Sequence, residues 1–284
     1  MLRSRSPVLQ LGPADAEAAL ATCAEDPDAN VFVAARILDG VLGGGGGLLL
    51  GHPDDGTPGR WRSLVWAGAN VVPVQLDPSE APAYLARLRR RQRWSSSVFG
   101  PAAAVQALWG DLSHWWGRPR AVRERQPVMA TTTPPSLLGC ALDERVRLAR
   151  PEEVDAVVPA AAAMFTEEIG YPPYVGSVAA YRQAVALLVE QGRTYVVTEG
   201  DEVVFKADVG SVALGVAQVQ GVWLTPRLRG QGLAGPAMAS VVEAVLATTA
   251  PRVSLYVNDF NARARATYAG IGMEHVGDFR TVLL

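Results

Sequence analysis

Hydrophobic and polar positions in the second half of the chain follow two periods, one typical of strands and the other of amphipathic helices. Short apolar or alternating runs predict strands at 146–149, 194–198, 203–209, 216–224 and 253–257. Helical spacing predicts helices at 151–165, 178–191, 231–248 and 262–271, and residues 273–284 indicate a closing strand or hairpin. The predicted order is therefore β-α-α-β-β-β-loop-α-β-α-β.

The first half of the chain follows a similar order. Residues 13–40 are predicted to be helical, with Asp15 available as a cap and Asp26-Pro27 interrupting the middle. The elements predicted after them are strands at 48–50, 61–67 and 71–76, a helix at 79–93, a strand at 94–99, a helix at 101–116 and a strand at 120–130. The proline-bearing stretch 131–139 is the best linker candidate. We therefore expect a first domain at 1–135, a linker at 136–143 and a second domain at 144–284.

A basic, glycine-containing loop joins the strand at 216–224 to the helix that follows. It reads Leu-Thr-Pro-Arg-Leu-Arg-Gly-Gln-Gly-Leu-Ala over residues 224–234. Glycines let a ligand approach the main chain, and the unpaired N–H groups of a helix start suit an anion. The loop is therefore a candidate phosphate cradle, although a tight turn without a ligand would have the same sequence features.

Three phosphate-binding patterns compete for this loop. The triphosphatase pattern needs a lysine after its second glycine, and the only lysine of the chain, Lys206, lies elsewhere. A dinucleotide fingerprint fits the three glycines from Gly230 to Gly235, but 225–229 separate it from the strand. The acid that would hold the ribose, Asp259, also leaves too few residues for the remaining units of that fold. The third pattern, Arg-x-x-Gly-x-Ala, starts at Arg229.

A second motif follows the strand at 253–257, with Asn261, Ala264, Tyr268 and Gly272 at fixed spacing and Met273 after them. Together the two motifs resemble the GCN5-related N-acetyltransferases (GNAT), whose last motif position is Phe rather than Met. The resemblance covers 143–284 and implies the fold of that family.

The first half lacks the glycine loop, because it has Leu-Asp-Pro-Ser at 76–79, where Asp77 would repel a phosphate. The whole chain thus resembles the tandem GNAT proteins of actinobacteria. We expect an α/β protein of two GNAT-like domains, each a mixed, mostly antiparallel twisted sheet flanked by helices. The first domain would be degenerate and bind no coenzyme. Its tryptophans, Trp109, Trp115 and Trp116, are expected in the core or at a domain contact.

The resemblance implies acetyl-CoA as co-substrate and direct attack by a primary amine. The main chain of the loop would hold the pyrophosphate, a free strand edge would pair with the pantetheine arm, and Tyr268 would protonate the leaving thiolate. The cofactor-binding residues expected on this basis are Val222, Leu224, Arg229, Gly230, Gln231, Gly232, Leu233, Ala234 and Asn261. The strands before the loop should separate to admit the acetyl group.

The general base is less clearly marked in the sequence. Many GNAT enzymes carry a glutamate on the strand before the loop, whereas this strand has Gln218 and Gln220. A period of two would place both glutamines on the face of Val222 and Leu224. The resemblance makes Glu167 and Glu168, expected in the loop between the first two helices of the domain, the nearest candidate acids. A solvated role for both, and a water relay, remain open.

Composition adds few constraints beyond these motifs. The chain is 49% hydrophobic and 19% charged with a net charge of −2, so nothing favours nucleic acid or a membrane surface as partner. Cys23 and Cys140 lie far apart without metal-ligand spacing, which predicts free thiols and no metal. No secretory signal and no long apolar run are apparent, so we expect a cytoplasmic protein. A homodimer remains open.

Two candidate functions therefore remain for this protein. One is an N-acetyltransferase that acts on an amine, polyamine, aminoglycoside or protein N-terminus. The other is a sensor or scaffold that binds acyl-CoA without turnover, which the absence of a carboxylate on the strand favours.

Overall fold

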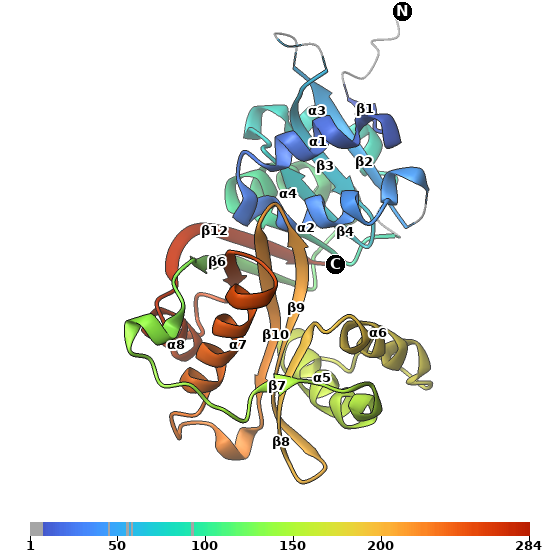
Figure 1. Ribbon diagram of the computed structural model, residues 1–284. Helices are drawn as coiled ribbons and strands as arrows, with labels where there is room; N and C mark the ends of the chain where they lie inside the picture. Colours follow the sequence, from blue (N-terminus) through green and yellow to red (C-terminus); the bar gives the residue numbers. More distant parts are fainter. Residues whose placement is uncertain (1–7, 45, 55–56, 58, 92–93) are drawn as a thin grey trace, which may run out of the picture. The chain divides into compact units, whose positions relative to one another are not determined.

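The computed structural model describes residues 8–44, 46–54, 57, 59–91 and 94–284 (Figure 1). The chain divides into two compact units. Unit 1 consists of the chain up to Val128 together with Tyr256–Phe260 and His275–Leu284. Unit 2 consists of Met129–Leu255 and Asn261–Glu274.

Unit 1 is a sheet with helices, and its strands follow the order β1-β2-β3-β4-β5-β12-β6. The strands are β1 (Leu9–Gln10), β2 (Leu48–Pro53), β3 (Trp61–Ala67), β4 (Asn70–Val74), β5 (Ser97–Pro101), β6 (Ala121–Thr131) and β12 (Glu274–Leu283). The helices are α1 (Ala16–Cys23), α2 (Pro27–Leu38), α3 (Ala81–Leu88) and α4 (Ala102–Trp116). From β1 to β4 neighbouring strands are antiparallel, and β4 pairs in parallel with β5.

Unit 2 repeats this arrangement with the order β11-β10-β9-β8-β7. The strands are β7 (Arg147–Leu148), β8 (Thr194–Glu199), β9 (Glu202–Ala213), β10 (Val216–Leu224) and β11 (Arg252–Tyr256). The helices are α5 (Val154–Ile169), α6 (Ala179–Glu190), α7 (Ala234–Thr248) and α8 (Ala262–Gly270). From β7 to β10 the pairing is antiparallel, and β10 pairs in parallel with β11. Helices α5 and α6 cover one face of β9 and β10, and α7 covers the other (Figure 1).

The two units therefore share one pattern: three antiparallel strand pairs, then one parallel pair. This confirms the predicted tandem, mostly antiparallel α/β fold. Among the described residues, the sequence predicted every α-helix and all strands except β1, a two-residue strand at Leu9–Gln10.

The last strand of the chain belongs to unit 1, which differs from the expected boundary of a second domain at 144–284. Backbone pairs join β12 to β5, from Phe279 opposite Pro101 to Leu283 opposite Ser97. Local periodicity predicts a strand but not its partner. In the expected linker, the Ser136 N–H and hydroxyl donate to the Glu243 carboxylate, and the Asp143 N–H donates to the Ser240 hydroxyl. Both ends of this segment are therefore hydrogen-bonded to α7.

Helix starts follow the sequence signals where a side chain caps them. Asp26 accepts a hydrogen bond from the Ala29 N–H at 3.1 Å, and Pro27 occupies the first turn of α2. Asp15 precedes α1, but its carboxylate accepts from the Gly12 N–H instead. Helix α3 ends at Leu88, earlier than predicted, and the end of the predicted helix at 92–93 lies outside the described residues.

Each unit has its own apolar core. The core of unit 1 includes Trp109 and Trp116, as predicted for core residues, whereas Trp115 is 49% exposed. The core of unit 2 joins α5 and α6 to the sheet through Val196, Val203 and Trp223. Trp223 therefore marks the face of β10 that packs against α5.

Candidate active site

The glycine loop, defined here as Thr225–Leu233, connects β10 to α7 within unit 2. It begins with a short 3-10 turn at Pro226–Leu228 and then passes through Gly230 and Gly232, whose φ angles are +79° and +77°. These angles favour glycine, because a Cβ atom is strained there. A Cβ added at either position would meet no atom within 4 Å, so the space beside the loop is open.

Helix α7 begins at Ala234, later than predicted. Pro236 consequently falls in the first turn, where its missing N–H costs no helical hydrogen bond. Leu233 occupies the N-cap position and provides no side-chain hydrogen bond to the helix. A helix start that opens onto uncrowded glycines fits a pyrophosphate, because the first N–H groups and the helix dipole both favour an anion.

Strand β10 parts from β11 before the loop is reached. The parallel ladder runs from Val216 opposite Arg252 to Gln218 opposite Ser254, whereas β10 continues to Leu224. The ladder thus ends where the predicted separation of the two strands should begin.

A β-bulge in β10 overturns the predicted grouping of side chains. Gln220 lies opposite Asp208, but Trp223 lies opposite Lys206, so β10 has one residue more than β9 in this interval. The extra residue reverses the alternation. Gln220 therefore shares a face with Trp223, and Leu224 lies on the other face. Gln218 is buried and Gln220 is exposed.

Glu167 contacts the glycine loop. Arg229 Nη2 donates to both carboxylate oxygens of Glu167, at 3.0 and 2.8 Å, and Trp223 Nε1 donates to Oε1 at 3.2 Å. Arg229 also donates from Nε to the Leu224 carbonyl at 2.8 Å. Gln231 donates to the Arg227 carbonyl, which folds the loop on itself. One expected catalytic acid is thus tied to one expected coenzyme-binding residue.

Glu167 and Glu168 are helical, which corrects the prediction that they lie in a loop. Helix α5 extends to Ile169 and ends at Gly170, whose φ is +90°. The polar residues Thr166, Glu167 and Glu168 suit a helix end as well as a loop, and the signal that ends the helix is the left-handed Gly170. Both glutamates are exposed at the carboxyl end of the helix. Negative charge is disfavoured there by the helix dipole, so Glu167 gains from its contact with Arg229.

Tyr268 lies on α8 and Asn261 is the N-cap of this helix, an arrangement that fits the second motif. Tyr268 is 7% exposed, and burial, with a smaller contribution from the charge of Glu168, raises its pKa above the usual range. The hydroxyl is therefore protonated at neutral pH, as a proton donor must be, but it is a weaker acid than a free tyrosine. Asn261 caps the helix by accepting from the Ala264 N–H at 3.1 Å.

Sequence reasoning missed two charged residues near the bulge, Lys206 and Asp208 of β9. They are 1% and 7% exposed and form an ion pair. The available signal was their spacing, since two charges at i and i+2 within an apolar strand lie on one face and must be paired to be buried.

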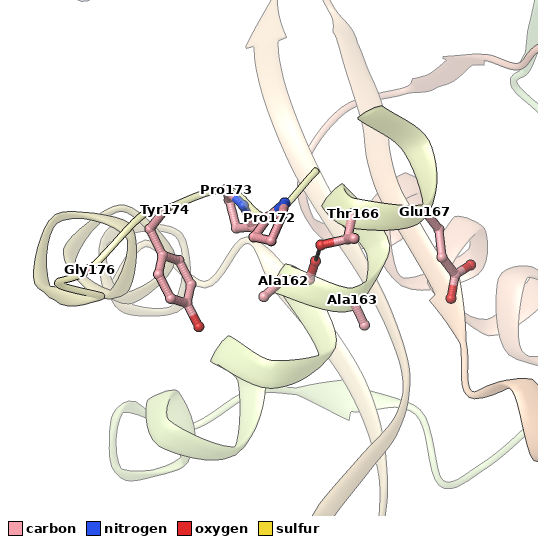
Figure 2. A pocket seen from close by; sticks show the side chains of 8 residues that line it. All are labelled: Ala162, Ala163, Thr166, Glu167, Pro172, Pro173, Tyr174 and Gly176. Atoms are coloured by element: carbon pink, nitrogen blue, oxygen red, sulfur yellow. Dashed lines mark hydrogen bonds between the residues drawn. The ribbon is translucent and has the colours of Figure 1, made fainter. Parts of the chain in front are cut away.

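A cavity of about 580 Å³ lies beside α5 (Figure 2). Pro172, Pro173 and Tyr174 face Ala162 and Ala163 across it, so its walls are mainly apolar. The remaining residues that line it are Thr166, Glu167 and Gly176. Within the described part of the chain, no three His, Cys, Asp or Glu side chains gather as a metal site would require. Among the same residues, no helix has the length and apolarity needed to cross a bilayer.

Comparison with protein families agrees with this geometry. The family described as "Acetyltransferase (GNAT) family" matches residues 161–273, which contain the end of α5, the glycine loop and α8. Residues 161–273 form a GNAT domain. This family transfers acetyl groups and uses acetyl-CoA as co-substrate. A second family, described as "Domain of unknown function (DUF4081)", matches residues 47–157. No curated protein sequence matches the chain.

Three solved GNAT structures resemble this chain over most of its length. A GCN5-related N-acetyltransferase from Sphaerobacter thermophilus is 18% identical with a TM-score of 0.61, over 98% of this chain and 95% of that one. A GCN5-related N-acetyltransferase from Kribbella flavida is 19% identical with a TM-score of 0.54, over 89% and 94%. A tandem GNAT protein from the clavulanic acid biosynthesis pathway is 14% identical with a TM-score of 0.54, over 97% and 98%. These likenesses concern the fold.

Proposed function

We propose that the protein transfers an acetyl group from acetyl-CoA to a primary amine, with both substrates bound together. The observation that carries the proposal is the open glycine loop at the end of a strand that has parted from its neighbour. Acetyl-CoA supplies an activated thioester when bound. The N–H groups from Arg229 to Ala234 would hold its pyrophosphate, and the main chain of Val222 and Leu224 would align the pantetheine arm, with Asn261 nearby.

The reacting atoms would lie beside the bulge of β10. A backbone N–H there can polarise the acetyl carbonyl toward attack. The amine would approach from the cavity beside α5, whose mainly apolar walls would contact its carbon chain. Tyr268 would return a proton to the departing thiolate. Since β10 carries no carboxylate and Glu167 is held by Arg229, we assign deprotonation of the amine to Glu168 or to a water relay.

Calorimetric titration with acetyl-CoA, followed by a thiol-release assay over a panel of amines, tests this proposal. We expect micromolar or tighter binding and thiol release with at least one amine. An absence of binding would contradict both the enzyme and any coenzyme-dependent role.

The second candidate is an acyl-CoA sensor or scaffold. The pairing of Glu167 with Arg229 favours it, because this contact occupies an acid that an enzyme would use. Tight binding of acetyl-CoA without thiol release from any amine would support this alternative.

Unit 1 would then have a structural role and bind no coenzyme. The position after β4 that corresponds to the glycine loop is a 3-10 turn at Pro78–Glu80, capped by Asp77. The Asp77 carboxylate accepts from the Ser79 N–H at 2.8 Å, so it occupies the group that a phosphate would need. The domain limits of 1–135 and 144–284 remain a proposal for the sequence, although β12 pairs within unit 1, and a cytoplasmic location is proposed as well.

A further inference from the structure

The bulge of β10 is held by the buried ion pair of β9. Lys206 Nζ donates to Asp208 Oδ2 at 2.5 Å and to the Gly221 carbonyl at 3.1 Å. The other carboxylate oxygen of Asp208 accepts from Thr194 Oγ1 at 2.9 Å. Lys206 is thus fixed between a carboxylate and one peptide of the bulge, inside the face that packs against α5.

Glycine is required at position 221 by two independent features. Its φ is +60°, and a Cβ built there would lie 2.8 Å from Asp208 Oδ2 and 3.1 Å from Lys206 Nζ. The ion pair therefore occupies the space that a side chain would fill. The backbone of the bulge and the two charges form one closely fitted group.

This contact determines the direction of the next N–H. The Gly221 carbonyl and the Val222 N–H belong to one planar trans peptide and point in opposite directions. Because the carbonyl is directed at the Lys206 ammonium group on the α5 side of the sheet, the Val222 N–H is directed away from that group. At this point of β10 the ladder with β11 has already ended, since it runs only from Val216 to Gln218.

We propose that Lys206 and Asp208 are positioning residues that aim the Val222 N–H at the carbonyl oxygen of the acyl thioester. The inference rests on the proposed function, since it names the residues that orient the backbone donor of the proposed acetyl site. Neither charged residue touches the reacting atoms. Lys206 fixes the peptide through its carbonyl, and Asp208 fixes Lys206. A preoriented N–H stabilises the negative charge that develops on the oxygen when an amine attacks.

The main measurement of the test is the polarisation of the bound carbonyl, which needs no acceptor; turnover is measured separately with an amine that supports thiol release. Isotope-edited infrared spectroscopy with acetyl-CoA carrying ¹³C at the acetyl carbonyl reports the C=O stretch. Bound to the wild-type protein, this band is expected at lower frequency than in free acetyl-CoA. In the double variant Lys206→Met with Asp208→Asn, which leaves no isolated buried charge, we expect the band to return toward the free value. Affinity for acetyl-CoA should stay within about threefold, while thiol release falls roughly a hundredfold.

Two further variants keep the test decisive. Gly221→Ala disturbs the same contact with both charges present, so it should shift the band in the same direction even where the double variant fails to fold. Arg147→Met is the matched control, because it breaks the Arg147–Glu153 pair of the same unit at a distance from β10 and should leave the band unchanged.

The outcomes separate this inference from the proposed function. A double variant or a Gly221→Ala variant that binds acetyl-CoA with the wild-type band and wild-type turnover would overturn the positioning role while leaving the acetyltransferase proposal intact. A wild-type protein that binds no acetyl-CoA would overturn both, and this result would be known before any variant is made.

Discussion

Arg229 and Glu167 join the glycine loop to the end of helix α5 through two hydrogen bonds of 3.0 and 2.8 Å. Their side chains are 41% and 44% exposed, so the pair contributes little to the stability of the fold. A pyrophosphate bound at the proposed site would compete with Glu167 for the guanidinium group of Arg229.

Replacing Glu167 by Gln should therefore tighten the binding of acetyl-CoA. The change removes a negative charge near the proposed pyrophosphate site and releases Arg229 toward the phosphates. We expect the Kd to fall by a few fold at low salt, with a smaller difference at high salt because exposed charges are screened. Calorimetric titration at two salt concentrations measures both effects, and Glu168→Gln removes the same charge from the neighbouring position as a control.

An unchanged or weaker affinity of the Glu167→Gln variant would contradict this competition. Its turnover answers a second question. Loss of roughly a hundredfold or more would identify Glu167 as the general base, despite its contact with Arg229.

Gly232→Glu should abolish acetyl-CoA binding. The new carboxylate would project into the open space beside the loop, where the pyrophosphate is proposed to lie. A residue other than glycine at φ +77° also costs about 1–2 kcal/mol of backbone strain, which a folded unit can tolerate. Gly232→Ala separates this strain from the charge, and Gly235→Ala, in the first turn of α7, is the matched control. Retained affinity in the glutamate variant with a wild-type melting curve would refute the cradle.

Tyr268→Phe should lower turnover roughly a hundredfold and leave the Kd of acetyl-CoA within a few fold. The ring remains, so the packing of this buried side chain on α8 is conserved, and only the proton donor is lost. Steady-state kinetics and calorimetry on the same preparation distinguish the two effects. Wild-type turnover in the variant would mean that water protonates the thiolate and that Tyr268 is a packing residue.

Stability should fall in acid because of Glu153. Hydrogen bonds from Arg147 at 2.7 Å, with further help from Arg150, lower the pKa of Glu153 to about 2 from an ordinary 4.5. Because the pKa of Glu153 is lower in the folded protein than in the unfolded chain, its ionised carboxylate stabilises the fold at pH values above 4.5. This contribution is lost as the pH falls from 4.5 toward 2. Urea unfolding at pH 7, 4 and 3 should show a smaller loss for Glu153→Gln than for the wild type. Parallel losses in the two proteins would contradict the assignment.

Much of the fold could be predicted because local apolar periodicity marks strands and helices regardless of their partners. The order β10, glycine loop, α7 followed directly from the sequence, since glycines at positive φ and a helix start have recognisable residue types. The expected site residues all lie in unit 2. Whether they bind coenzyme stays a prediction.

The predictions that were wrong depend on structural features that a local sequence pattern does not encode. One inserted residue at the bulge reverses which face of β10 a side chain occupies, while the Gln-x-Gln pattern before it continues unchanged. The end of α5 depends on the left-handed Gly170 rather than on the polar residues before it. The pairing of β12 with β5 joins residues far apart in the sequence, such as Phe279 and Pro101, and no local window reports such a contact.

This last pairing predicts how a fragment of the chain behaves. Expressed alone, residues 140–284 retain β12 but lack β5, so the backbone groups from Phe279 to Leu283 lose their partners. Phe279 and Val282, buried in the full chain, would also lose the apolar surroundings that unit 1 supplies. An unpaired, apolar strand edge promotes association. We therefore expect oligomers or precipitate by size-exclusion chromatography with light scattering, while the full chain elutes as one species of defined mass under the same conditions.

A matched fragment that ends at residue 273 lacks β12 and should associate less through this edge. A monomeric 140–284 fragment with full acetyl-CoA-dependent activity would show that β12 folds without β5, and that unit 1 has a role other than completing this strand pairing.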